Sequence, residues 1–263
     1  MLKTRFITAV IALIIFGAVL FVLPPAAAKS VIALLIIAGA WEWSAFLGLS
    51  ANTARYFFVA LIGALMAGVV FVVPAWSELI LQIACVWWGV AFIWTFFFPT
   101  PIPLAIRWLA GALILVPLFI ALLLLYSISP QMLLFALLIV WVADMGAYFS
   151  GKKFGRVKLA PSISPGKTWE GVFGGLIMVA VLTVVWSQYY AGMDLAVLIP
   201  FCLAVGALSV VGDLTVSMFK RTAGVKDSGK LFPGHGGVLD RVDSVSAAAP
   251  LFVLGLNWLG LVS

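Results

Sequence analysis

Charged residues are scarce in this chain. They make up 9% of its 263 residues, and a single histidine is present. Hydrophobic residues make up 65%, and the mean hydropathy is +1.25. A soluble domain of this length has too little interior to bury so much apolar surface. The composition therefore excludes an ordinary soluble protein and predicts an integral membrane protein.

Cysteine is also scarce, and the common nucleotide-binding motifs are missing. The two cysteines, Cys85 and Cys202, lie in separate apolar segments without metal-ligand spacing, so we expect buried free thiols. Neither a Walker A sequence nor a dinucleotide G-x-G-x-x-G sequence is present. The net charge is +6, but the basic residues lie between apolar segments. We therefore predict no nucleic-acid partner and assign the charge to membrane topology and anionic ligands.

Long apolar segments follow one another along the chain. Nine of them approach or reach the roughly 20 residues that a helix needs to cross a bilayer. They run over residues 6–23, 30–49, 56–74, 76–98, 107–127, 130–149, 171–191, 195–219 and 244–262. The first imitates a signal peptide, but it is long enough to span, so we expect it to be retained. We predict an all-α polytopic membrane protein with about nine transmembrane helices.

The distribution of Lys and Arg predicts the orientation. With a cytoplasmic N-terminus and nine alternating spans, every Lys and Arg except Lys29 falls on the cytoplasmic side, and the C-terminus lies outside. We divide the chain into an N-terminal part, 1–128, with about five spans and a C-terminal part, 129–263, with about four. The second part contains two long cytoplasmic loops, 150–170 and 220–243, where we expect the chemistry.

Three carboxylates fall inside apolar segments, where an ionisable group is costly and is a functional candidate. They are Glu42, Asp144 and Asp213. Glu42 lies between Trp41 and Trp43 well inside its segment, and the sequence leaves a functional and a structural role equally open. Asp144 and Asp213 lie near the cytoplasmic ends of their spans, so both can meet the polar loops.

Polar residues share one face of the eighth predicted span. Ser209, Asp213 and Ser217 recur at intervals of four residues, and Lys220 and Arg221 follow them. Hydrogen bonds between neighbouring helices would explain the serines, but they would not explain why an aspartate lies in this apolar segment. We therefore expect this face to contribute to a site.

Asp240 and Asp243 form a second acidic group, because they share a face if a helix starts there. Two close carboxylates repel each other unless a cation lies between them, and hard oxygen ligands suit Mg²⁺. With Asp213 they form a candidate nucleotide–metal site. The alternative is a structural role as capping residues, since carboxylates are stabilised near a helix N-terminus.

Both long loops are strongly basic. The first ends in the turn sequence SPGKTWEG, which contains Lys167, and the second contains His235 beside Gly236 and Gly237. Basic side chains neutralise phosphates, and glycines allow close backbone approach to a ligand. The alternative is a solvated loop or a contact with anionic lipids of the inner leaflet.

The sequence SMFKRTAGVKDSGKLFPGHGGVLDRVDS, at 217–244, resembles the signature of the phosphatidate cytidylyltransferases, the CDP-diacylglycerol synthases. The signature positions are occupied by Ser217, Lys220, Arg221, Lys226, Asp227, His235, Gly236, Gly237, Asp240, Arg241 and Asp243. The stretches DMGAYFSGKKFG and SPGKTWEG also resemble segments of this family. The likeness therefore covers the chain from about residue 140 onward.

The resemblance implies transfer of CMP from CTP to phosphatidic acid, with CDP-diacylglycerol and pyrophosphate as products. It implies Mg²⁺, with the identity of a second cation left open, on Asp213, Asp240 and Asp243. Expected contacts to the substrates come from Ser217, Lys220, Arg221, Lys226, Gly236, Gly237 and Arg241. His235 is expected near the leaving pyrophosphate, and Asp144 and Lys167 are further candidates. A bacterial-type inner membrane, a cytoplasmic active site and a homodimer are also implied.

Two other functions fit the sequence less well. A secondary transporter could use intramembrane carboxylates to carry an ion or solute, but it should contain paired internal repeats. The two halves of the chain show no convincing repeat. A CDP-alcohol phosphotransferase would carry a D-G…A-R…G…D…D pattern, which is absent.

Overall fold

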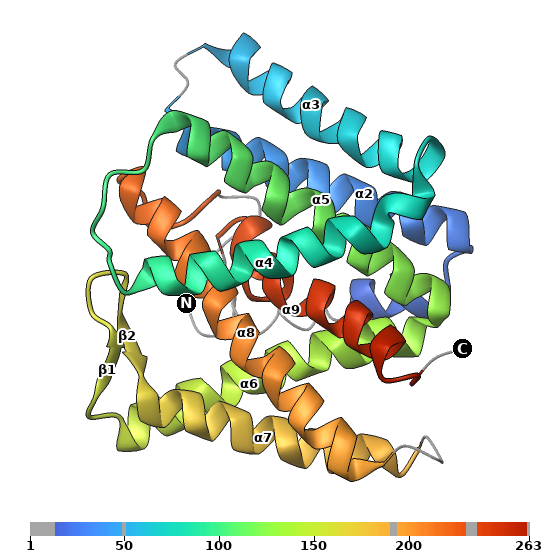
Figure 1. The fold of residues 1–263 in the computed structure, drawn as a ribbon, viewed down its shortest axis with the longest axis vertical. Coiled ribbons are helices and arrows are strands. Elements are labelled where there is room, and N and C mark those ends of the chain that lie inside the picture. The colour runs from blue at the N-terminus through green and yellow to red at the C-terminus, as the bar shows by residue number, and fades with distance from the viewer. Residues whose placement is uncertain (1–13, 49–50, 190–193, 230–235, 262–263) are drawn as a thin grey trace.

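The computed structural model describes residues 14–48, 51–189, 194–229 and 236–261 (Figure 1). The α-helices with assigned bounds are α2 (Pro25–Trp43), α3 (Asn52–Phe71), α4 (Ser77–Thr95), α5 (Leu104–Ile128), α6 (Pro130–Phe154), α7 (Trp169–Ser187), α8 (Leu195–Thr222) and α9 (Leu239–Trp258). Short 3₁₀ segments, η1 (Ser44–Leu47) and η2 (Pro74–Trp76), follow α2 and precede α4. Strands β1 (Lys158–Ala160) and β2 (Ser164–Thr168) form an antiparallel hairpin. Apart from this hairpin, the prediction of an all-α protein is confirmed.

Helix starts are set by proline and by polar N-cap residues. Pro25 and Pro130 occupy the first positions of α2 and α6, where the fixed φ of proline fits and its missing N–H is not needed. The side-chain oxygens of Ser129, Thr168 and Asp194 accept hydrogen bonds from first-turn amides of α6, α7 and α8. Local sequence therefore fixes where several spans begin.

Seven helices in the described part of the chain are long and apolar enough to cross a membrane. They correspond to the second to eighth predicted spans, with ends shifted by a few residues. Residues 14–21 are helical and belong to the first predicted span, whose start lies outside the described residues. The ninth predicted span corresponds to α9, which is not among the seven.

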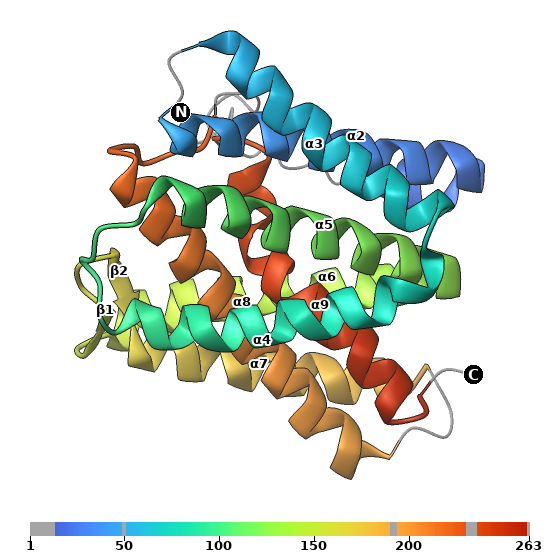
Figure 2. The same cartoon turned by 45° about the horizontal axis from the view of Figure 1, so that its top comes forward.

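α9 lies in the middle of the molecule, behind α4 in Figures 1 and 2, and contacts α2, α4, α5, α6 and α8. Every residue from Asp243 to Leu256 except Leu251 is buried. The helix is rich in alanine and serine, which allow neighbouring helices to approach closely. Because helices rather than lipid surround it, α9 needs no strongly apolar surface.

Both predicted loops are shorter than the sequence indicated. α6 continues to Phe154, and the residues between it and α7 include the β1–β2 hairpin, so the loop predicted at 150–170 is smaller. α8 continues to Thr222, and α9 begins at Leu239, which shortens the loop predicted at 220–243 at both ends. Hydropathy marks where a segment stops being apolar, whereas a helix can continue into the polar residues that follow.

Glycines allow close packing of α6 and α7, which lie side by side along one edge of the molecule (Figures 1 and 2). A Cβ atom at Gly146 of α6 would lie 2.9 Å from the carbonyl oxygen of Gly174 in α7. One at Gly175 would lie 2.5 Å from the carbonyl oxygen of Ala143. These small residues therefore serve packing within a single chain.

Gly175→Ala should lower the free energy of unfolding by about 1–3 kcal/mol, because the new methyl group would overlap the Ala143 carbonyl group. The matched control is Gly89→Ala in α4, where the added Cβ would meet no atom within 4 Å beyond its chain neighbours and the nearby backbone of its own helix. There alanine should be neutral or stabilising through its higher helix propensity. Thermal unfolding in detergent tests both variants. Equal melting temperatures would contradict the close α6–α7 packing.

Candidate functional site

The C-terminal half of α8 presents the polar face expected from its sequence. Ser217 Oγ donates a hydrogen bond to Asp213 Oδ1 over 3.0 Å. Lys220 follows almost one turn later, near the cytoplasmic end predicted for this span. Ser209, one turn before Asp213, is buried and donates to the carbonyl oxygen of Gly206 instead. Asp213, Ser217 and Lys220 are therefore the residues of this face that interact with other polar side chains.

The β1–β2 hairpin supplies the partner of Asp213. Lys167 Nζ, on β2, lies 2.7 Å from Asp213 Oδ2, and both side chains are about one-quarter exposed. Arg221 Nε donates to the carbonyl oxygen of Ile163 over 3.2 Å. In Figures 1 and 2 the hairpin lies on the same side of the molecule as the C-terminal end of α8. The structure thus brings the two basic loops together.

Lys220 connects α8 to the start of α9. Its Nζ donates to Asp240 Oδ1 over 2.9 Å and lies 3.7 Å from Asp243 Oδ2. Because α9 begins at Leu239, Asp240 and Asp243 lie in its first turns and share a face, as the sequence predicted. Lys220 and Asp243 are buried. A buried ammonium group between two carboxylates offsets part of their mutual repulsion.

Asp240 also organises the backbone at both ends of residues 228–238, which we call the motif loop. Its Oδ2 accepts hydrogen bonds from the amides of Ser228 and Gly237, both over 2.9 Å. Gly236 has φ +82°, and a Cβ there would lie 2.5 Å from Asp240 Oδ2, so glycine is required on both counts. Both oxygens of Asp240 therefore have protein partners, which supports a structural role.

Asp144 brings α6 to the same place. Ser244 Oγ, next to Asp243 in α9, is 3.5 Å from Asp144 Oδ2, a long hydrogen bond. Asp243 Oδ1 accepts from the amide of Ser244 over 2.8 Å. Asp144 thus adds a fourth aspartate to those of α8 and α9. The sequence indicated Asp144 only as a further candidate.

The carboxylates are the type of ligand that Mg²⁺ takes, but they are not assembled as a complete ligand set. Among the described residues, no group of three or more His, Cys, Asp or Glu side chains is placed to hold a metal ion. Asp213 and Asp240 instead contact the ammonium groups of Lys167 and Lys220. Because Mg²⁺ usually completes its shell with water and substrate phosphates, one or two of these carboxylates are sufficient anchors. The donor chemistry fits the ion on that basis.

The remaining predicted site residues surround this centre or lie outside the described residues. Arg221, Lys226 and Arg241 are exposed, as expected for side chains that meet a soluble anion. Gly237 is buried against the start of α9. His235 lies outside the described residues, so its predicted role near pyrophosphate stays a prediction.

Glu42 is the residue whose role the sequence left open. It lies in the last turn of α2 and is 7% exposed. Its Oε1 accepts from the amide of Val238 over 3.0 Å, and its Oε2 accepts from the amide of Leu239 and from Ser228 Oγ, each over 2.8 Å. The available signal was a carboxylate well inside an apolar segment, which has to find partners. Its partners are the ends of the motif loop.

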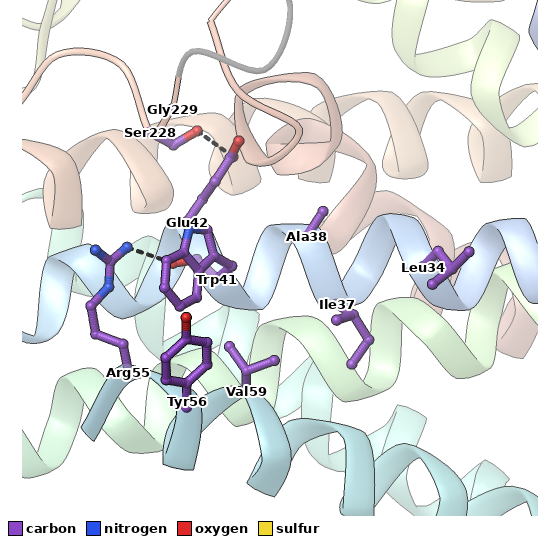
Figure 3. Close-up of a pocket in the computed structure, with 10 residues that line it drawn as sticks. All are labelled: Leu34, Ile37, Ala38, Trp41, Glu42, Arg55, Tyr56, Val59, Ser228 and Gly229. Atoms are coloured by element: carbon purple, nitrogen blue, oxygen red, sulfur yellow. Dashed lines mark hydrogen bonds between the residues drawn. The ribbon is translucent and has the colours of Figure 1, made fainter. Parts of the chain in front are cut away.

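A groove of about 720 Å³ lies between α2 and α3 beside Glu42 (Figure 3). Its lining is largely apolar, with Ser228 and Gly229 of the motif loop at one end. Arg55 is held at the same end by a hydrogen bond to Ser44 Oγ and by stacking over Trp41, 4.1 Å from the ring centroid. The groove therefore places an apolar surface beside Glu42 and one end of the motif loop.

Comparisons with known proteins identify the family of the chain. The sequence pattern of the Cytidylyltransferase family matches residues 3–259. A phosphatidate cytidylyltransferase of Pseudomonas aeruginosa is 41% identical over 266 residues, covering 98% of this chain and 97% of that protein. One of Haemophilus influenzae is 38% identical over 285 residues, covering 96% and 97%, and one of Staphylococcus epidermidis is 45% identical over 120 residues, covering 45% and 46%. The chain therefore belongs to the cytidylyltransferase family and is a nucleotidyltransferase, as its C-terminal motif predicted.

Proposed function

We propose that the protein transfers CMP from CTP to phosphatidic acid, giving CDP-diacylglycerol and pyrophosphate. The observation that carries this proposal is the meeting of Lys167, Asp213, Lys220 and Asp243 at one place, from the hairpin, α8 and α9. Phosphate-rich reactants need such a mixture of cationic and metal-binding groups. The names of the two relatives that match nearly the whole chain support the choice of substrates. The apolar groove that ends at the motif loop supports a lipid as the acceptor.

The chemistry follows from the charges of the reactants. An oxygen of the lipid phosphate attacks the α-phosphorus of CTP, and the bond from that phosphorus to the oxygen bridging to the β-phosphate breaks. Pyrophosphate leaves with the electron pair. The lipid phosphate is already ionised at neutral pH, so no strong general base is needed. Positioning and charge neutralisation are therefore the main tasks of the protein.

The residues of the site can share these tasks. Lys167 and Lys220, which contact carboxylates in the free protein, would turn to the phosphates of the substrates. The exposed Arg221, Lys226 and Arg241 would bind the nucleotide at the surface of the site. Ser217 would hold Asp213 by a hydrogen bond, and Asp144 would orient the site through Ser244. Gly236 and Gly237 would contact the substrates through their backbone, and His235 would contact pyrophosphate.

Mg²⁺ held by Asp213, Asp240 and Asp243 would supply positive charge beside the reacting phosphates. Both oxygens of Asp240 and both oxygens of Asp213 already have protein partners. Among the described residues, Asp243 Oδ2 faces only Lys220, at 3.7 Å, so Asp243 is the strongest anchor. We further propose a multi-pass protein of a bacterial-type inner membrane with about nine spans, a cytoplasmic N-terminus and an active site facing the cytoplasm. A homodimer belongs to the same proposal.

Incubating the purified protein with phosphatidic acid, Mg²⁺ and CTP tests the reaction. Label on the α-phosphate of CTP should pass into the organic phase, whereas label on the γ-phosphate should remain in water. EDTA should abolish the transfer if Mg²⁺ is required. Folded protein that transfers no α-label, with lipid and detergent varied, would contradict the proposed pair of substrates.

A further inference from the structure

Glu42 connects a helix of the N-terminal part to the two ends of the motif loop. It extends from α2 towards Ser228 (Figure 3), and its carboxylate accepts hydrogen bonds from Ser228, Val238 and Leu239. Ser228 precedes residues 230–235, and the other two follow them. One buried carboxylate therefore fixes both ends of the motif loop, which contains His235, Gly236 and Gly237 of the family signature.

The backbone around this carboxylate is shaped to receive it. A Cβ atom added at Gly229 would lie 2.7 Å from Glu42 Cδ, and one at Gly237 would lie 2.5 Å from the same atom. The nearest atoms in both cases are carboxylate oxygens of Glu42. Any side chain at either position would push the loop away from Glu42. The glycines thus allow a close contact that the loop makes with α2.

Glu42 also serves the start of α9. The first amides of a helix have no partner within the helix, and Val238, the residue before α9, provides no side-chain cap. Glu42 accepts from the amides of Val238 and Leu239 and places negative charge at the positive end of the helix. The cap that α9 lacks in its own sequence therefore comes from α2.

The contacts continue from Glu42 to the reacting centre. Ser228 bonds to Glu42 through its hydroxyl group and to Asp240 Oδ2 through its amide. Asp240 Oδ1 accepts from Lys220, which also faces Asp243. A shift of the first turn of α9 would move both aspartates relative to Lys220. Glu42 is thus connected to Lys220 and Asp243 through the hydrogen bonds of Ser228 and Asp240.

We infer that Glu42 is a positioning residue for nucleotidyl transfer, which holds the first turn of α9 so that Asp240 and Asp243 face Lys220. The inference rests on the proposed function for its kinetic consequence. Glu42 does not touch the reacting atoms. Its removal should therefore slow the chemical step more than it weakens binding of CTP.

Glu42→Gln is the informative substitution, because the side chain keeps its size but has one acceptor oxygen fewer. Its amide NH₂ would face a backbone N–H of Val238 or Leu239, and two donors cannot bond to each other. We expect kcat per folded molecule to fall by about 10- to 100-fold, as for groups that orient catalytic ligands. KM for CTP should change by less than about threefold, because the substitution leaves the groups that bind CTP in the ground state in place. Glu42→Ala should lower kcat by a larger factor than Glu42→Gln.

Glu78→Gln is the matched control, because Glu78 lies exposed in the first turn of α4 and bonds only to the side chain of Gln82 among the described residues. It should leave kcat unchanged. A kcat for Glu42→Gln within about twofold of the wild type, per folded molecule, would overturn the inference. If Glu42→Gln yields no folded protein, kcat and KM are measured for Ser228→Ala instead. This substitution removes one of the three hydrogen bonds to the Glu42 carboxylate.

Hydrogen–deuterium exchange provides a readout that does not depend on activity. In Glu42→Gln, the amides of residues 236–240 should exchange faster, while those of α6 and α7 keep wild-type protection. Unchanged protection at 236–240 would overturn the inference, and faster exchange throughout the chain would show a general structural role instead. If the wild-type protein itself transfers no label, the proposed function fails, and the exchange result still decides whether Glu42 positions α9.

Discussion

Asp243→Asn should reduce turnover by about 1,000-fold or more while the protein remains folded. Asp243 is buried, and its Oδ2 faces Lys220 at 3.7 Å, whereas its Oδ1 is bonded to the amide of Ser244. Oδ2 is therefore the oxygen that can turn to a cation at the reacting phosphates. Charge stabilisation by a bound cation is worth several kcal/mol in the transition state, and about 1.4 kcal/mol corresponds to a factor of ten.

Initial rates of lipid labelling at saturating CTP measure this loss, with gel filtration and thermal unfolding to verify the fold. Asp194→Asn is the matched control. Asp194 caps the opposite end of α8 through a hydrogen bond to the amide of Ala196, and asparagine caps a helix about as well. It should retain full activity. Turnover by Asp243→Asn within about tenfold of the wild type would remove Asp243 from the proposed ligands.

Lys220→Met should lower both stability and activity. The substitution leaves Asp240 and Asp243 without the ammonium group that lies between them, and breaking a buried charge pair typically costs about 3–5 kcal/mol. At about 2–4 °C per kcal/mol for a protein of this size, the melting temperature should fall by about 6–20 °C. Thermal unfolding in detergent without nucleotide measures the shift.

The double variant Lys220→Met/Asp240→Asn separates the two effects. Removal of one carboxylate relieves the uncompensated charge, so part of the lost stability should return, while activity stays low because Lys220 is missing. Lys226→Met, at an exposed position, is the stability control and should unfold at the wild-type temperature. A Lys220→Met protein as stable as the wild type would mean that its ammonium group does not hold the two aspartates together.

The sequence predicted those parts of the fold that depend on local pattern. Seven of the predicted spans correspond to helices of suitable length and hydropathy, because both properties are set within about 20 residues. The start of a helix near Asp240 and the shared face of Asp213 and Ser217 also follow from spacing. Both cysteines are free as predicted, but only Cys202 is buried, whereas Cys85 is partly exposed. The C-terminal motif was sufficient to identify the family.

Contacts between distant segments could not be predicted in this way. Glu42 and Leu239 are far apart in the sequence, and no periodicity links a carboxylate in α2 to a helix start in α9. The pairing of Lys167 with Asp213 depends on the hairpin, which hydropathy cannot reveal in a polar loop. Asp240 was predicted as a metal ligand or a capping residue, but its two amide partners, Ser228 and Gly237, precede α9, so these bonds hold the loop rather than cap the helix.

The length of α8 sets the depth at which the two substrates would meet. Its 28 residues correspond to about 42 Å at 1.5 Å per residue, whereas the hydrocarbon core of a bilayer is about 30 Å thick. Asp213 lies about 27 Å along the axis from Leu195. A helix that starts at one edge of the hydrocarbon would therefore bring Asp213 close to the other edge, and its last turns, with Lys220, would extend into the headgroup layer. A phospholipid holds its phosphate near that edge, so under the proposed function the acceptor would not have to leave the bilayer and the nucleotide would not have to enter the hydrocarbon.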